Sequence, residues 1–149
     1  MIYTFAQLPP RDLSSQDFPD NTIALNITRS VNGQPSDALL SQADIMAFTQ
    51  RAWRLSPKHA NDAKLILATY VVPGRGRLIL GAFRFGRQYE HPGGDCFVRS
   101  PYPKDEDRCI FLAEPAEAEI WRKYVGHYLP LTKKGEANPV RYYDTDEEN

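Results

Sequence analysis

The spacing of hydrophobic and polar residues predicts a strand followed by a helix. Residues 22–28 alternate Ile, Leu and Ile with small or polar side chains, which is the period-two pattern of a strand with one buried face. A turn is expected at residues 32–35. Ser41, with a carboxylate three residues later at Asp44, predicts the capped start of an amphipathic helix that ends near Arg54.

The strongest pattern in the chain is a β-hairpin. Residues 65–72 and 78–85 are rich in β-branched and aromatic side chains, and the segment 73–77, Pro-Gly-Arg-Gly-Arg, joins them. Glycine supplies the backbone freedom that a tight connection needs. Just before the hairpin, serine followed by proline predicts a short helix over residues 56–63.

The second half of the chain alternates loops with regular elements. Residues 86–108 are rich in proline, glycine and charge, and predict a long loop with a brief strand at 96–98. A further strand is expected at 109–113. Proline at 115 then indicates the start of a helix over residues 116–128, which carries apolar side chains on one face.

Length and composition bound the fold. With 149 residues, 42% of them hydrophobic, the chain predicts one domain over residues 1–143. Residues 1–21 form an irregular lead-in to it, and the acidic residues 144–149 are expected to be a disordered tail. The expected class is α+β, with a small, bent, mostly antiparallel sheet or open barrel and two or three flanking helices.

Several classes of protein are excluded. No apolar run approaches the roughly 18 residues of a membrane span, and the first residues do not resemble a secretory signal, so we expect a cytoplasmic protein. Cys96 and Cys109 are expected to be reduced thiols. The three histidines are scattered without metal-ligand spacing, so neither a metal nor another cofactor is expected.

Charge is distributed unevenly although the net charge is −1. Residues 51–134 hold fifteen basic and nine acidic side chains, whereas residues 1–50 hold two and five, and residues 135–149 hold one and five. A local positive field attracts phosphate even when the whole chain is close to neutral. The basic middle therefore indicates an anionic partner.

Candidate contacts for that partner combine arginine with aromatic residues. Arginine offers a planar fork for phosphate, and aromatic rings stack on bases. The candidates are Arg75, Arg77, Arg87 and Tyr89 around the hairpin, Trp53 and Arg54 at the end of the first helix, and Lys133, Lys134, Asn138 and Arg141 after the last helix.

Strand alternation limits which hairpin residues can share a surface. Phe83 and Phe85 point to one face, and Arg84 points to the other. The structural reading places both phenylalanines in the core and Arg84 on a solvated face. For the basic cluster around Trp53 and Arg54, the alternative is that its cations complement the dipole at the end of the first helix. For Lys133 and Lys134, the alternative is a solvated loop.

Evidence for an enzyme is thin. The sequence Gly74-Arg75-Gly76 resembles part of a phosphate loop but lacks the remaining motif. Glu114, Glu117 and Glu119, together with Asp95 or Asp105, could surround a metal in a nuclease, and the alternative is a solvated helix start. The sequence leaves enzyme activity open and favours a non-enzyme.

Four short motifs resemble a family of small bacterial and phage domains of the PUA-like group, which includes EVE, ASCH and YTH domains. The motifs are Trp53-Arg54-Leu55, Arg108-Cys109-Ile110-Phe111, Tyr124-Val125-Gly126 and Asn138-Pro139-Val140-Arg141-Tyr142. The resemblance implies a pocket that binds RNA or modified bases near Trp53, Arg54, Phe83 and residues 138–142. Residues 86–107 lack the tryptophan expected after the hairpin.

The leading hypothesis is a binding module for nucleic acid, including a modified base, or for a nucleotide-type ligand. A second hypothesis is a phage or bacterial defence-related inhibitor that docks on a host protein and uses its acidic ends as a nucleic-acid mimic. A third is a nuclease or nucleotide-processing enzyme.

Overall fold

The computed structural model describes most of the regular elements of the chain. The described residues are 11–19, 21–35, 40–50, 52–54, 63–85, 97–99, 108–111, 113–130 and 140–143. Side chains are described for all of these except 52, 54, 85, 97–99, 108–111 and 142. Most of the predicted helix at 56–63, most of the predicted loop at 86–108 and the predicted tail at 144–149 lie outside this set.

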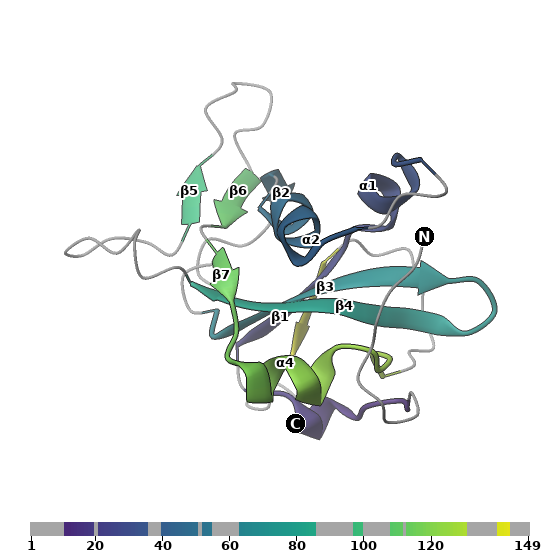
Figure 1. Cartoon of the computed structure of the whole chain (residues 1–149). Helices are drawn as coiled ribbons and strands as arrows, with labels where there is room; N and C mark the ends of the chain where they lie inside the picture. The colour runs from purple at the N-terminus through teal and green to yellow at the C-terminus, as the bar shows by residue number, and fades with distance from the viewer. Residues whose placement is uncertain are drawn as a thin grey trace.

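A five-stranded mixed sheet forms the centre of the protein (Figure 1). In spatial order its strands are β7 (Ala113–Pro115), β4 (Gly76–Phe85), β3 (Leu65–Val72), β1 (Thr22–Asn26) and β8 (Val140–Tyr143). Neighbouring strands are antiparallel except for β1 and β3, which are parallel. Within the described residues β7 and β8 are the two edges, so the sheet is open. With its helices, the structure is of the α+β class, as predicted.

The predicted hairpin is confirmed as β3 and β4, with β4 starting two residues earlier than expected. The turn lies at residues 73–75. Gly74 has a φ of 76° and Gly76 a φ of 142°, a backbone conformation that glycine adopts without steric cost.

A β-bulge in the hairpin changes which face each residue of β4 meets. Ala68 pairs with Gly81, but Thr69 pairs with Ile79, so Leu80 is the extra residue. A side chain at Gly81 would lie 2.9 Å from Ile45, in the same cluster that holds Leu80. Leu80 and Gly81 therefore face the same side, and the residues before the bulge, Ile79 and Arg77, are shifted to the other side.

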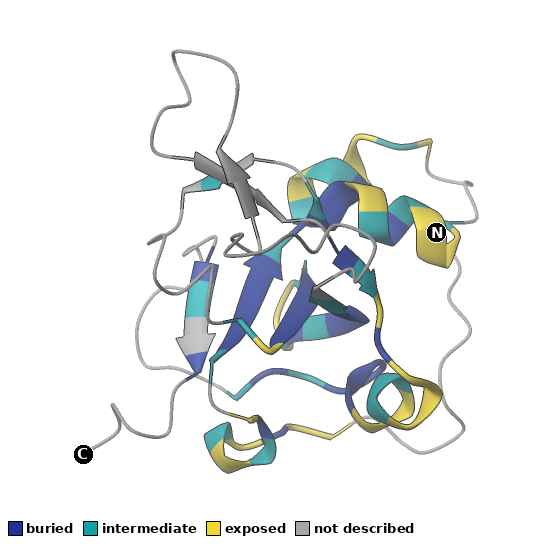
Figure 2. Ribbon diagram, turned by 90° about the vertical axis from the view of Figure 1, so that its left-hand side faces the viewer, coloured by how far each residue is buried: buried dark blue, intermediate teal, exposed yellow. Residues whose placement is uncertain are grey.

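Two hydrophobic clusters cover the two faces of the sheet, and Figure 2 shows the buried residues along the central strands. One face packs against α2 (Gln42–Thr49) through Ile45 and Phe48. The other packs against α4 (Ala118–Tyr124) and against the segment that contains the 3-10 helix η1 (Ser15–Asp17). In β1, Ile23 and Leu25 belong to the first cluster and Ala24 to the second, as strand alternation requires.

Helix α2 begins as predicted and ends earlier. Ser41 N–H donates to Asp44 Oδ2 at 2.8 Å, and Asp44 N–H donates to Ser41 Oγ at 3.1 Å, which confirms the capping box. The Ser41 backbone N–H and, to a lesser extent, the Ser41 hydroxyl, which donates to Asp44 Oδ2 at 3.0 Å, hold the pKa of the Asp44 carboxyl below its usual value of 3.8. The end of the helix lies at Thr49.

The prediction that this helix continues to Arg54 is wrong. Residues 52–54 form β2 (Ala52–Arg54), which pairs with β6 (Arg108–Phe111), and β6 pairs in turn with β5 (Phe97–Arg99) in a second, three-stranded sheet. The Trp53 indole N–H donates to the Thr49 carbonyl at 2.8 Å, satisfying one of the last carbonyls of α2. Strand pairing with residues more than fifty positions away therefore replaces the last helical turn.

Three other boundaries differ from the predictions. The turn expected at 32–35 follows a short helix, α1 (Thr28–Asn32), and β1 ends at Asn26, whose side-chain oxygen accepts the Thr28 N–H at 3.0 Å. The strand expected at 109–113 is split into β6 and β7, which belong to different sheets. Pro115 lies in β7 rather than at a helix start, and α4 is shorter than predicted. The brief strand predicted at 96–98 is present as β5.

Candidate functional site

Three residues from distant parts of the chain meet at the tip of the hairpin, and we call them the Arg75 site. The Arg75 guanidinium lies over the Tyr128 ring, with Cζ 3.8 Å from the ring centroid. Its Nη1 donates to Asp12 Oδ1 at 2.7 Å. A cation stacked on an aromatic face and hydrogen-bonded at its edge is held in one orientation.

The backbone explains why these residues meet. Tyr128 N–H donates to the Arg11 carbonyl and Leu13 N–H donates to the Tyr128 carbonyl, both at 2.9 Å. Tyr128 also forms an isolated bridge with Leu78 in β4. Tyr128, four residues after the end of α4, is therefore fixed between the N-terminal segment and the hairpin, which brings Asp12 and Arg75 together beside its ring.

Among the predicted site residues whose side chains are described, Arg75 is the one whose location fits contact with a ligand. Its side chain is 39% exposed, and that of Asp12 is 46% exposed. The sequence prediction named Arg75 but missed Asp12 and Tyr128. The bridge between Asp12 and Tyr128 carries no local signal, since it joins segments more than a hundred residues apart.

Arg77 corrects the sequence prediction of an exposed loop arginine. Its side chain is buried, with 1% of the residue exposed, and its Nε and Nη2 donate to Thr69 Oγ1 at 3.2 and 3.0 Å. Thr69 Oγ1 itself donates to the Leu25 carbonyl at 2.9 Å. The β-bulge turns Arg77 onto the face that Leu129 and its neighbours cover, so Arg77 supports the fold rather than the surface.

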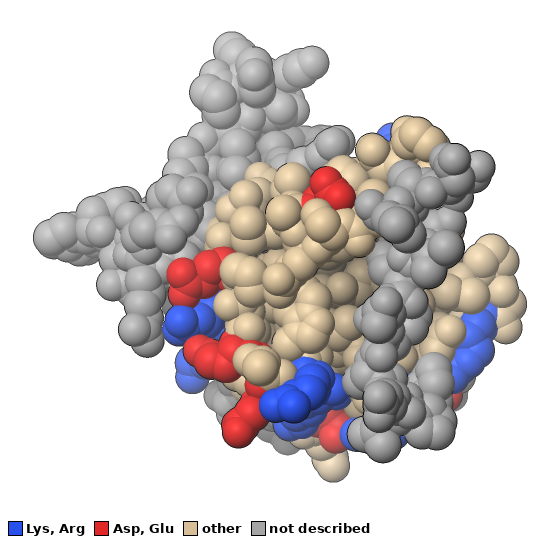
Figure 3. All heavy atoms as spheres, viewed as in Figure 1, with Lys and Arg blue, Asp and Glu red and all other residues tan. Residues whose placement is uncertain are grey.

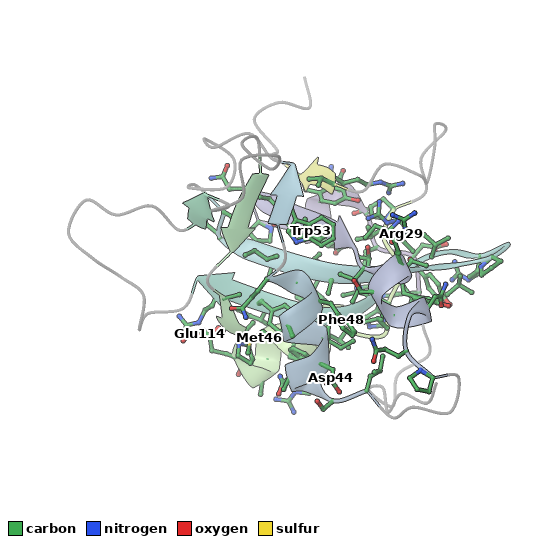
Figure 4. The ribbon with its side chains drawn as sticks, turned by 90° about the horizontal axis from the view of Figure 1, so that it is seen from above. Arg29, Asp44, Met46, Phe48, Trp53 and Glu114 are labelled. Atoms are coloured by element: carbon green, nitrogen blue, oxygen red, sulfur yellow. The ribbon has the colours of Figure 1, made fainter. Side chains whose placement is uncertain are left out.

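Among the other predicted contacts, Trp53 and Arg141 have described side chains, and neither is part of the Arg75 site. Trp53 is half-buried against the first cluster, and Figure 4 shows it beyond the end of α2 and over the sheet. Arg141, in β8, is half-buried, and its Nη1 donates to the Pro130 carbonyl at 3.3 Å. The side chain of Arg54 is not among those described. Arg87, Tyr89, Lys133, Lys134 and Asn138 lie outside the described residues.

The end of β4 carries an ion-pair cluster. Arg84 Nη2 lies 2.8 Å from Glu114 Oε1, and its Nε lies 3.4 Å from Glu117 Oε1. Arg84 is thus half-buried and paired rather than fully solvated. Two of the three glutamates considered for a metal site neutralise this arginine, and the described residues contain no group of three metal-ligating side chains.

Positive and negative side chains are interspersed on the described surface. Figure 3 shows Lys and Arg next to Asp and Glu around α4 and the end of β4. Three arginines, Arg11, Arg75 and Arg84, each lie within 4.0 Å of a carboxylate. Among the described residues of this face, therefore, cations do not form one continuous patch.

His127 anchors the N-terminal segment beside the Arg75 site. The side chain is buried, and its Nδ1 accepts the Arg11 backbone N–H at 3.2 Å. Burial holds the pKa of His127 below the usual 6.5, and the charge of Arg11 acts in the same direction. The neutral ring is therefore the form that fits the folded protein.

Acidification is expected to destabilise the fold through this histidine. Because the pKa is lower in the folded than in the unfolded state, the unfolded chain takes up the proton first. The stabilising contribution is complete above pH 6.5 and decreases as the pH falls from there towards the folded pKa. Thermal unfolding measured from pH 7.5 to 5 should show a falling midpoint, and the slope should be smaller in His127→Gln. A His59→Gln variant provides the control, and equal slopes in all three proteins would contradict the prediction.

Comparisons of the chain with protein-family models, curated proteins and solved structures find no match. None of the helices in the described part of the chain has the length and apolar character needed to cross a membrane.

Proposed function

We propose that this chain is a cytoplasmic binding module for a nucleic acid or a nucleotide-type ligand, with Arg75 in contact with phosphate. The observation that carries the proposal is the orientation of Arg75, whose planar cation is stacked on Tyr128 while its edge donates to a carboxylate. Phosphate accepts hydrogen bonds from guanidinium in the same way as carboxylate. The site is partly exposed, so a ligand can reach it.

The distribution of charge supports the same class of ligand. Residues 51–134 carry the excess of basic side chains, and the proposal assigns further phosphate or base contacts to Arg87, Tyr89, Lys133, Lys134 and Asn138. Recognition of a base by a PUA-like domain is the narrower form of the proposal. It is supported by the four sequence motifs and by the open sheet with flanking helices.

Replacement of Arg75 is expected to weaken binding of a fluorescent single-stranded oligonucleotide. One lost phosphate contact should reduce the slope of log affinity against log salt by about 0.7 in Arg75→Ala. Arg75→Lys should be intermediate, because it keeps the charge but loses the planar fork. Fluorescence anisotropy between 25 and 200 mM salt, roughly the range over which such contacts are screened, measures both effects.

Lys64→Ala is the matched control for this experiment. Lys64 is exposed and precedes β3, at the end of the hairpin opposite to Arg75, so it should leave the salt slope closer to that of the wild type. If the wild-type protein shows no salt-dependent binding, the proposed function is wrong. The inhibitor that docks on a host protein then becomes the better proposal, and the pairing of Arg11, Arg75 and Arg84 with carboxylates favours it.

A further inference from the structure

The carboxylate of Asp12 accepts a hydrogen bond from the edge of Arg75, and a guanidinium edge donates to phosphate in the same way. Asp12 Oδ1 lies 2.7 Å from Arg75 Nη1, a short distance typical of a charge-assisted hydrogen bond. Within the described residues this is the one hydrogen bond of the guanidinium, whose flat face is covered by Tyr128. An incoming anion that approaches the same edge of Arg75 therefore meets Asp12.

We propose that Asp12 is an intramolecular competitor that must leave Arg75 before an anionic ligand binds there. This inference rests on the proposed function and adds its regulation. In the absence of ligand the carboxylate neutralises Arg75 and holds it over Tyr128. In the bound state a phosphate oxygen accepts the Nη1 hydrogen bond, and the Asp12 carboxylate turns towards solvent.

The local structure permits this exchange. Both side chains are partly exposed, and an exposed ion pair contributes little to stability. The backbone next to Asp12 is fixed separately, through the hydrogen bonds of Arg11 and Leu13 with Tyr128, so rotation of the side chain does not detach the segment. The Tyr128 ring also stays beneath Arg75. The exchange thus changes one side chain rather than the fold.

Competition by a carboxylate selects for ligands with more negative charge. A phosphate monoester carries about −1.5 to −2 at pH 7, compared with −1 for Asp12. A ligand with a terminal phosphate, or a strand with several phosphates, displaces the carboxylate more readily than a nucleoside or a monocarboxylate does. Asp12 therefore restricts the Arg75 site to ligands that carry enough negative charge to displace its carboxylate.

The test compares Asp12→Asn with the wild type in oligonucleotide binding at fixed salt. The amide keeps the shape of the carboxylate and removes its charge, so affinity should rise about two- to fivefold, the range expected for loss of an exposed ion pair. Glu119→Gln is the matched control, because Glu119 is an exposed residue of α4 with the same change of charge. In the double variant Asp12→Asn, Arg75→Ala the gain should disappear, since the competitor acts only on Arg75.

The outcomes separate this inference from the proposed function. If Arg75→Ala weakens binding but Asp12→Asn matches the wild type or Glu119→Gln, the competitor is overturned and the binding function stands. A gain in affinity that persists in the double variant also contradicts the proposed role of Asp12 as a competitor, since the effect is then one of net charge. A gain in affinity that Asp12→Asn shows, that Glu119→Gln does not show and that the double variant loses supports the competitor. Absence of binding by all variants overturns both proposals.

Discussion

Replacement of Arg77 by alanine is expected to lower the free energy of unfolding by about 3 to 5 kcal/mol. The residue is 1% exposed, so the change removes a fully packed side chain and the two hydrogen bonds that it donates to Thr69 Oγ1. Urea unfolding followed by the fluorescence of Trp53 and Trp121 measures the loss.

Arg75→Ala provides the control in the same hairpin. Arg75 is two residues away and chemically identical, but its ion pair with Asp12 is partly exposed, so the expected loss is at most about 1 kcal/mol. Should Arg77→Ala be too unstable to purify, Thr69→Val tests the same contact. This variant keeps the shape of Thr69 and removes the oxygen that accepts from Arg77 Nε and Nη2, at an expected cost of about 1 to 3 kcal/mol. Equal stability of the Arg75 and Arg77 variants would show that Arg77 belongs to the surface.

The sequence predicted elements whose signals are local. The capping box of α2 involves two residues three positions apart, and the hairpin of β3 and β4 has only a short turn between its strands. The prediction that Phe83 points inward is confirmed, since strand alternation depends on the nearest neighbours alone.

The sequence could not reveal features set by distant pairings. Residues 52–54 follow a helical pattern, yet they form β2 because β6 offers backbone partners. Arg77, expected in an exposed loop, lies in β4, and the bulge at Leu80 turns its side chain to the side of the sheet that holds Ile79 and Leu129. One inserted residue thus moves the side chain of each earlier residue in β4 to the opposite face of the sheet.

The residues of the candidate site also differ in whether the sequence could predict them. Arg75 was predicted from its position in a glycine-rich turn, which is a local property. Asp12 lies 63 residues from Arg75 in sequence, within the segment that was predicted to be an irregular lead-in. Neither residue type nor spacing indicates that the two meet, because the contact depends on the bridge through Tyr128.

Replacement of Phe83 by alanine is expected to cost about 3 to 5 kcal/mol of stability, because the side chain lies fully in the core. Its ring meets the Trp121 indole edge-on, with centroids 5.7 Å apart and an interplanar angle of 85°, and so connects β4 to α4. The PUA-like resemblance instead implies that Phe83 lies near the ligand. A packing role predicts that a Phe83 variant loses stability, whereas a ligand-binding role predicts that it loses affinity.

Phe83→Leu separates them, because leucine keeps most of the apolar volume and loses the aromatic ring. If Phe83 acts by packing, this variant should lose about 1 kcal/mol of stability and bind the oligonucleotide as tightly as the wild type. If Phe83 stacks on a base, the leucine variant should lose affinity by about 1 to 3 kcal/mol while remaining folded. Because the ring is fully buried in the cluster that includes Ile45 and Phe48 of α2, and also meets Trp121, the first result is expected. The second would require the core around Trp121 to open when ligand binds.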